Sequence, residues 1–163
     1  MQNKKTIVKE QGLKIRESKI EIFLDDLGAR KPAPGGGSAA ALSGALGISL
    51  VQMVANFSQD NSSQIHEILR KANKIKKELL KLIDEDAEAV SIFFNKSNSL
   101  LKRKRAEQAM HKIPITICQN CEQGLELIPY LIRKGNKNLI SDLKIARILL
   151  QAGAKGAKKL IHH

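Results

Sequence analysis

One short segment near the start of the sequence could bind an anion or a carbonyl group. It is the glycine-rich turn Pro32-Ala33-Pro34-Gly35-Gly36-Gly37-Ser38. Three successive glycines expose backbone N–H groups, and a following helix adds free donors and the positive end of its dipole. The lysine of a Walker phosphate loop is missing. The turn is therefore a candidate ligand cradle, although a tight connection between crowded helices would use the same residues.

A carboxylate in the segment Asp84-Glu85-Asp86-Ala87-Glu88 falls on the apolar side of an expected helix. At about 100° of rotation per residue, Phe93 lies within ~20° of Asp86 and Val90 within ~40°. Asp84 and Glu88 fall outside this apolar stripe. A carboxylate inside a core costs several kcal/mol unless it is paired or has a function, and burial raises its pKa toward a useful range. We favour an acid–base role for Asp86 over a structural bond to a helix end or an arginine.

Two further groups have ordinary explanations when taken alone. Asn138, Ser141 and Asp142 stand where a last helix begins, and capping that helix accounts for them. The pair Cys118 and Cys121 lies within an apolar helical run and lacks the two further ligands that a structural zinc site needs. We interpret these two cysteines as buried thiols. His66 and His111 are interpreted as isolated surface residues, and His162-His163 as a tag remnant or part of a native helix.

The elements that must position these groups are all helical. Apolar residues recur at helical spacing, and the regular turn signals of short strands are missing. Ser38 is the expected N-cap of the second helix, whose glycines Gly44 and Gly47 indicate the close approach of another backbone. We predict an all-α, up-and-down bundle of about five helices with one long central helix, the fourth interrupted by Pro114 and Pro129. The expected helices cover residues 18–30, 38–57, 62–96, 102–134 and 141 onward.

Composition limits the class of protein. The 163 residues suggest a single domain over 18–163, preceded by a basic arm over 1–17. The formal charge of +12 implies an attraction to anions, but aromatic residues make up only 3% of the chain, which argues against nucleic acid. A solvated basic surface is the first interpretation, and a polyanionic small ligand the second. No signal peptide is recognisable and the apolar stretch 39–57 is interpreted as a core helix, so we expect a cytoplasmic protein outside the membrane.

The motifs together resemble one family. The turn with its following Ala39-Ala40-Ala41, the segment Leu82 to Val90, and Gly135-Asn136-Lys137-Asn138-Leu139-Ile140-Ser141-Asp142 are similar, in order and spacing, to motifs of the cyclodeaminase/cyclohydrolase family. That family includes the C-terminal domain of formiminotransferase-cyclodeaminase and the stand-alone methenyltetrahydrofolate cyclohydrolases. The resemblance runs from about residue 20 to residue 160.

The resemblance implies an enzyme of one-carbon metabolism, a homodimer whose substrate is a reduced folate, with a polyglutamate tail as a further possibility. The implied reaction is hydrolysis of 5,10-methenyltetrahydrofolate to 10-formyltetrahydrofolate, without metal or cofactor. The family's catalytic aspartate corresponds to Asp86. The implied substrate-binding residues are Pro34, Gly35, Gly36, Gly37, Ser38, Asn138, Ser141 and Asp142.

Two other functions stay open from the sequence. The first, within the family, is a formimidoyltetrahydrofolate cyclodeaminase that releases ammonia, because both reactions need an acid–base group beside the same carbon. The second, of another class, is a non-catalytic helical protein that binds folate or nucleic acid.

Overall fold

The chain forms an all-α bundle, as the helical periodicity predicts. The computed structural model describes Ile15, residues 19–58 and residues 62–161; the predicted basic arm and His162-His163 fall outside this range, apart from Ile15. In the described residues there are five α-helices and one short 3-10 helix. They are α1 (Ile20–Gly28), α2 (Gly36–Asn56), α3 (Ser63–Phe94), α4 (Leu100–Lys134), η3 (Lys137–Leu139) and α5 (Ile140–Ile161).

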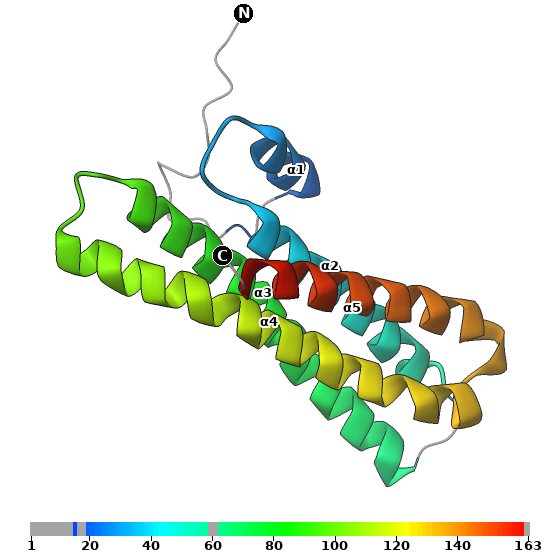
Figure 1. The fold of residues 1–163 in the computed structure, drawn as a ribbon. Helices are drawn as coiled ribbons and strands as arrows, with labels where there is room; N and C mark the ends of the chain where they lie inside the picture. Colours follow the sequence, from blue (N-terminus) through cyan, green and yellow to red (C-terminus); the bar gives the residue numbers. More distant parts are fainter. Residues whose placement is uncertain (1–14, 16–18, 59–61, 162–163) are drawn as a thin grey trace, which may run out of the picture.

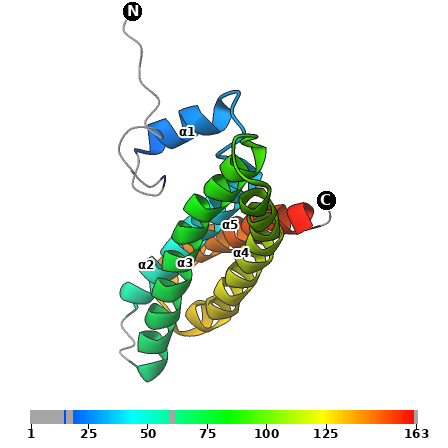
Figure 2. The same ribbon diagram turned by 90° about the vertical axis from the view of Figure 1, so that its left-hand side faces the viewer.

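Four of the helices run alongside one another. Helices α2 to α5 form an elongated bundle, and α1 lies beside the end at which α2 begins (Figures 1 and 2). The two longest helices, α3 and α4, form a hairpin whose connection projects beyond that end (Figure 1). The central place belongs to the shorter α2, which packs against α3, α4 and α5. The buried apolar side chains form one cluster, to which α1 adds Phe23.

Helices α2 and α5 approach each other through glycines. A Cβ atom on Gly153 would lie 2.8 Å from the carbonyl oxygen of Ala40, and one on Gly47 would lie 2.9 Å from that of Ala146. The two helices therefore run antiparallel, with backbones too close for side chains at these positions. The close approach predicted from the glycines of α2 is confirmed.

The predicted interruption of the fourth helix is wrong. Helix α4 continues unbroken through Pro114 and Pro129. A proline inside a helix removes one backbone hydrogen bond and crowds the preceding turn, but neighbours can keep the helix intact. Pro114 is buried in the bundle, where packing against the other helices offsets this cost. The helix predicted over residues 102–134 is present, and only the interruption expected at the two prolines is absent.

Helix α2 is also, within the described residues, the one helix long and apolar enough to cross a membrane. Of the 18-residue stretch of α2 that is this apolar, 56% is buried inside the bundle, as is also typical of a core helix.

The α2–α5 crossing predicts a contrast between two neighbouring glycines of α5. We expect Gly153→Ala to lower the free energy of unfolding by about 1–3 kcal/mol, because the new methyl group meets the backbone of α2. Gly156→Ala is the matched control: its methyl group would lie 3.5 Å from the Ala40 side chain, an ordinary contact. We expect it to be neutral or to stabilise by up to ~1 kcal/mol, since alanine favours the helix. Urea unfolding measures both, and equal losses would contradict the packing described.

Candidate functional site

The centre of the site is a carboxylate held by the first turn of a neighbouring helix. Asp86, on α3, is 6% exposed. Its Oδ2 atom accepts two hydrogen bonds from Ser38 on α2: one from the backbone N–H at 2.7 Å and one from the hydroxyl at 2.8 Å. The same hydroxyl lies 3.2 Å from the carbonyl oxygen of Ile83. The structure thus joins the glycine-rich turn to the aspartate that the helical angles single out.

Gly37 leaves room for the other carboxylate oxygen. A Cβ atom at this position would lie 2.0 Å from Oδ1 of Asp86, far inside a van der Waals contact. No such limit applies at Gly36, where an added Cβ would have nothing within 4 Å. One glycine of the three is therefore required by the carboxylate itself. Because Ser38 occupies Oδ2, Oδ1 is the oxygen left to act on a ligand.

Two opposing effects set the acidity of Asp86. Burial raises the pKa of this carboxyl above its ordinary value, since the charged form loses hydration. The side-chain and backbone hydrogen bonds from Ser38 favour the charged form and lower the pKa, and burial prevails. The carboxyl is thus shifted toward the range in which a group can both accept and return a proton.

A cavity of about 410 Å³ opens beside Asp86. This volume lies within the range of ~300–1,000 Å³ typical of small-molecule sites. Apart from Asp86, Glu107 and His111, its walls are backbone and apolar side chains. The lining residues are Pro32 and Gly35–Gly37 before and at the start of α2; Asp86, Val90 and Phe93 of α3; Glu107, Met110, His111 and Pro114 of α4; and Leu160 of α5.

The predicted turn residues divide between the cavity and the structure behind it. Gly35, Gly36 and Gly37 line the cavity, whereas Pro34 and Ser38 are buried outside its lining. Ser38 is not the N-cap of its helix, because that position belongs to Gly35 and the helix begins at Gly36. The serine hydroxyl, which could have capped the helix, is directed to Asp86 instead. Its place in the structure is that of a positioning residue.

The third predicted group lies far from this cavity within one chain. Because α2 and α5 are antiparallel, η3 and the start of α5 lie at the opposite end of α2, about 30 Å away at ~1.5 Å per residue. The amide of Asn136 donates to the carbonyl of Phe57 at 3.2 Å and its oxygen accepts from the N–H of Asn138, which fixes η3 to that end. Asn138 and Ser141 are exposed and Asp142 is half-buried. A single chain does not bring them to Asp86.

Sequence reasoning missed the residues that α4 contributes. Glu107 and His111 are exposed, as surface residues would be, yet both line the cavity. Phe93 also lines it, with the Arg103 guanidinium 5.7 Å from the centre of its ring. The spacing of Glu107, His111 and Pro114 places them on one helical face, which was the available signal. The sequence alone does not say which helix that face meets.

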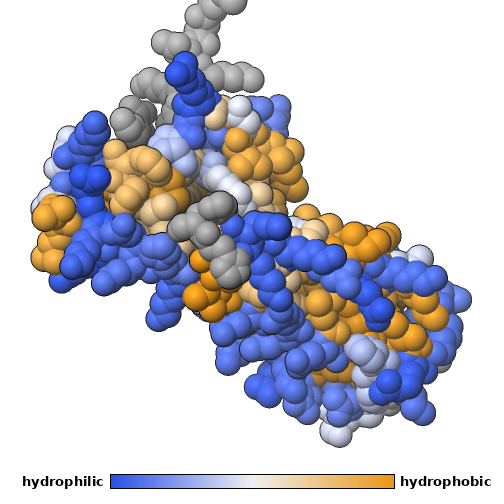
Figure 3. All heavy atoms as spheres, viewed as in Figure 1, coloured by the Kyte–Doolittle hydropathy of each residue, from blue (hydrophilic) through white to orange (hydrophobic). Residues whose placement is uncertain are grey.

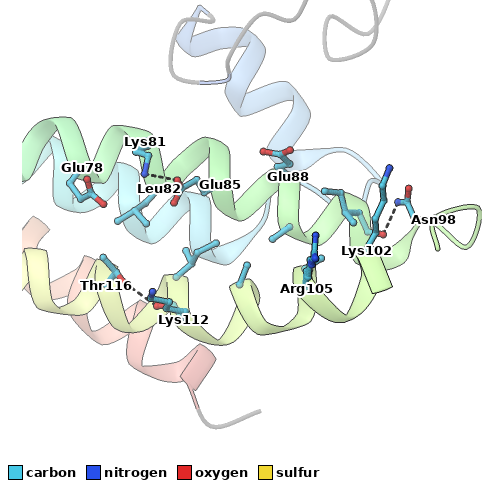
Figure 4. Close-up of a pocket in the computed structure, with 15 residues that line it drawn as sticks. Glu78, Lys81, Leu82, Glu85, Glu88, Asn98, Lys102, Arg105, Lys112 and Thr116 are labelled. Atoms are coloured by element: carbon cyan, nitrogen blue, oxygen red, sulfur yellow. Dashed lines mark hydrogen bonds and ion pairs between the residues drawn. The ribbon is translucent and has the colours of Figure 1, made fainter. Parts of the chain in front are cut away.

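A larger hollow of about 870 Å³ lies along α3 and α4 and does not include Asp86 (Figure 4). Its rims carry opposite charges, with Glu78, Glu85 and Glu88 on α3 and Lys102, Arg105 and Lys112 on α4. Lys81 of α3 is paired with Glu85 at 2.7 Å. The nearly balanced charge gives this groove no strong preference for an anion.

The cysteine pair behaves as packed thiols. Cys118 and Cys121 are free and buried. Burial raises the pKa of Cys121 to about 12 and also raises that of Cys118. The sulfur of Cys121 lies where side chains on Gly44 and Gly153 would be. These features fit a role in packing.

The contact between Gly37 and Asp86 predicts a strong effect of a single methyl group. Gly37→Ala displaces the carboxylate from Ser38, so we expect the free energy of unfolding to fall by about 1–3 kcal/mol. The Ser38 amide resonance should also stop following the titration of Asp86. Gly36→Ala is the matched control, with a change in stability below about 1 kcal/mol and the amide titration retained. Similar behaviour of the two variants in NMR and urea unfolding would contradict the described contact.

The chain is similar to several known proteins. Residues 19–162 match the family model described as formiminotransferase-cyclodeaminase. The chain is 31% identical to a methenyltetrahydrofolate cyclohydrolase of Methylorubrum extorquens over 85% of this chain and 74% of that protein. It is 27% identical to the formimidoyltransferase-cyclodeaminase of Rattus norvegicus over 86% of this chain, but it spans only 29% of that longer protein.

The fold also has a solved counterpart. A crystal structure of formiminotetrahydrofolate cyclodeaminase from Thermotoga maritima superposes with a TM-score of 0.81 and 25% sequence identity. The match covers 90% of this chain and 78% of that one. From the match to the family model and the identity to the cyclohydrolase, the chain belongs to the formiminotransferase-cyclodeaminase family.

Proposed function

We propose that this protein hydrolyses 5,10-methenyltetrahydrofolate to 10-formyltetrahydrofolate. The observation that carries the proposal is a buried carboxylate with one oxygen fixed by Ser38 and the other beside Gly37, at the wall of a cavity. The relative that bears this activity in its name is 31% identical over most of both chains.

The charge of the substrate suits this carboxylate. The methenyl carbon between N5 and N10 forms an amidinium-like cation, and the Asp86 carboxylate at the cavity wall would stabilise it. A water molecule adds to that carbon as Asp86 accepts one of its protons. The C–N5 bond then breaks while Asp86 returns the proton to N5. The reaction needs no metal or cofactor, because the substrate itself is the activated electrophile.

The cavity offers means of holding a flat ring. Phe93, Val90 and Met110 supply apolar surface, and backbone N–H groups at the start of α2 have no acceptor within the helix. The first turn of α2 would therefore hold polar edges of the pterin, or an oxyanion, through Gly36 and Gly37. The formal charge of +12 favours the glutamate tail of a folate, including a polyglutamate one, over neutral ligands. We place this reaction in the cytoplasm.

A second reaction has support from the relatives. The Thermotoga maritima structure and the Rattus norvegicus protein are named as cyclodeaminases. In that reaction N10 attacks a formimidoyl carbon on N5 and ammonia leaves. Asp86 suits both reactions, since each moves a proton beside the same carbon.

The test of the proposal is the loss of methenyltetrahydrofolate absorbance, followed with wild type and Asp86→Asn. We expect turnover above the spontaneous rate for wild type and a kcat lower by ~10²–10⁴-fold for the variant, the usual contribution of a general base. No turnover by wild type would overturn the assignment. Ammonia release from formimidoyltetrahydrofolate would then favour the cyclodeaminase. Salt-sensitive DNA binding without folate binding would instead favour a non-catalytic protein.

The same variant carries its own folding control. Because the folded pKa of Asp86 lies above the unfolded one, the stability contributed by its protonated form is present in acid and lost as the pH rises through the folded pKa. Asp86→Asn should therefore be at least as stable as wild type at neutral pH, with the advantage vanishing in acid. Thermal unfolding at two pH values separates a loss of chemistry from a loss of fold.

We also propose that a second copy of the chain completes the site. Leu46 lies midway along α2 and is 50% exposed, and Ile145 and Ile148 of α5 are 49% and 64% exposed. A hydrogen bond of 2.9 Å from Ser43 to the carbonyl of Leu149 joins the two helices along this face. Apolar side chains gather over the part of the surface where α5 begins (Figure 3). An exposed apolar surface of this kind is typical of an interface.

A two-fold axis that passes near Leu46 would place the α2 helices of the two chains antiparallel. The first turn of α2 in one chain would then lie beside the last turn of α2 in the other. Asn138, Ser141 and Asp142 of the partner subunit would then lie near Gly35–Gly37, the position from which a single chain excludes them. The three residues would hold the pterin or its neighbouring groups in that arrangement. This is the reason to favour a homodimer over a solitary chain.

The dimer predicts that one charge on this face separates the subunits. We expect Ile148→Glu to raise the dissociation constant of the dimer by about 100-fold or more, because a carboxylate would be desolvated in the interface. Turnover should fall with the dimer. Leu101→Glu is the matched control, since Leu101 is 61% exposed at the α3–α4 connection. Sedimentation velocity reads the outcome, and an active monomeric wild type would refute the arrangement.

A further inference from the structure

The cavity beside Asp86 holds a second set of titratable side chains. Glu107 and His111 are four residues apart on α4 and so share one helical face. Both are exposed to solvent while lining the same cavity as Asp86 and Gly37. Within the described lining, α3 contributes the carboxyl of Asp86, whereas the turn before α2 and helix α5 contribute no titratable side chain. Three groups that can carry a proton therefore surround one cavity.

The proposed reaction releases one proton for each turnover. The substrate is a cation and 10-formyltetrahydrofolate has lost that charge, so water supplies one oxygen, one proton for N5 and one proton for the solvent. Asp86 can carry the proton that moves from water to N5. The remaining proton leaves the hydroxyl of the tetrahedral intermediate, whose O–H electron pair becomes part of the new carbonyl as the C–N5 bond breaks.

Asp86 is poorly placed to deliver this second proton. It is 6% exposed and its Oδ2 atom accepts two hydrogen bonds from Ser38. At the moment when the carbonyl forms, Asp86 is also giving its own proton to N5. A second group that faces both the cavity and the solvent can accept the hydroxyl proton in the same step, faster than water alone.

We infer that His111 is that group: its imidazole accepts the proton of the intermediate's hydroxyl and passes it to bulk water. This inference rests on the proposed hydrolysis. Histidine is the side chain that exchanges protons near neutral pH, and His111 faces the cavity from an exposed helix position. Glu107, one turn away on the same helix, lines the cavity beside it. Asp86 activates water, and His111 releases the product proton.

The test compares His111→Gln with wild type over a range of pH, with and without added imidazole. We expect kcat near pH 7 to fall by about tenfold, less than the ~10²–10⁴-fold of a direct general base, because water can slowly replace a proton relay. The shape of the pH–rate profile should differ between the variant and wild type. Free imidazole should restore turnover, after subtraction of hydrolysis without enzyme. His66→Gln is the matched control, since His66 is an exposed histidine at the start of α3, outside the cavity lining.

Each other result overturns one of the two proposals. If wild type hydrolyses the substrate and His111→Gln has the same pH–rate profile, the proton relay is refuted and the proposed hydrolase activity is retained. A large loss of turnover that imidazole does not restore assigns His111 a merely structural role and also removes the relay. Absence of hydrolysis by wild type removes the proposed function itself.

Discussion

The hydrogen bonds from Ser38 to Asp86 are the contact on which the site depends. They join the first turn of α2 to the last third of α3, and they fix one carboxylate oxygen of a residue that lines the cavity. The contact requires Gly37, whose missing side chain gives that second oxygen its space. Serine and glycine in the turn thus serve the carboxylate directly.

Asp86 is also a buried charge without a partner cation in the described part of the chain. Burial raises its pKa and the hydrogen bonds of Ser38 lower it, with no lysine or arginine among the causes. A buried carboxylate without a countercharge lowers the free energy of unfolding. An uncharged residue would therefore usually be found at such a position. A cationic ligand would supply the missing countercharge. The amidinium of the proposed substrate, a methenyl folate, would be such a cation, and binding it would be a reason to keep the carboxyl in the core.

The sequence predicts the buried carboxylate correctly but misplaces several of its neighbours. The angular position of Asp86 among apolar residues predicted its burial, because helix geometry is local. Ser38 was assigned to a helix cap, since a pattern does not show that α2 starts two residues earlier at Gly36. The sequence alone predicts an isolated surface histidine at His111. It cannot show the contact of His111 with the cavity, because that contact depends on how α4 packs. The prolines of α4 were judged by local rules that packing overrides.

The third motif has a role within its own chain and, in the proposed dimer, a second role in the partner's site. Glycines fix α2 and α5 antiparallel, so the start of α5 cannot approach Asp86 of the same chain. Asn136 has a task within its own chain, since it bonds to Phe57 and to the backbone of η3. Asn138 and Ser141 are exposed beside it and have no comparable place in the packing. Exposed side chains on a rigid helix pair are available to a second chain, and the exposed apolar face across Leu46 is where the proposed partner would bind.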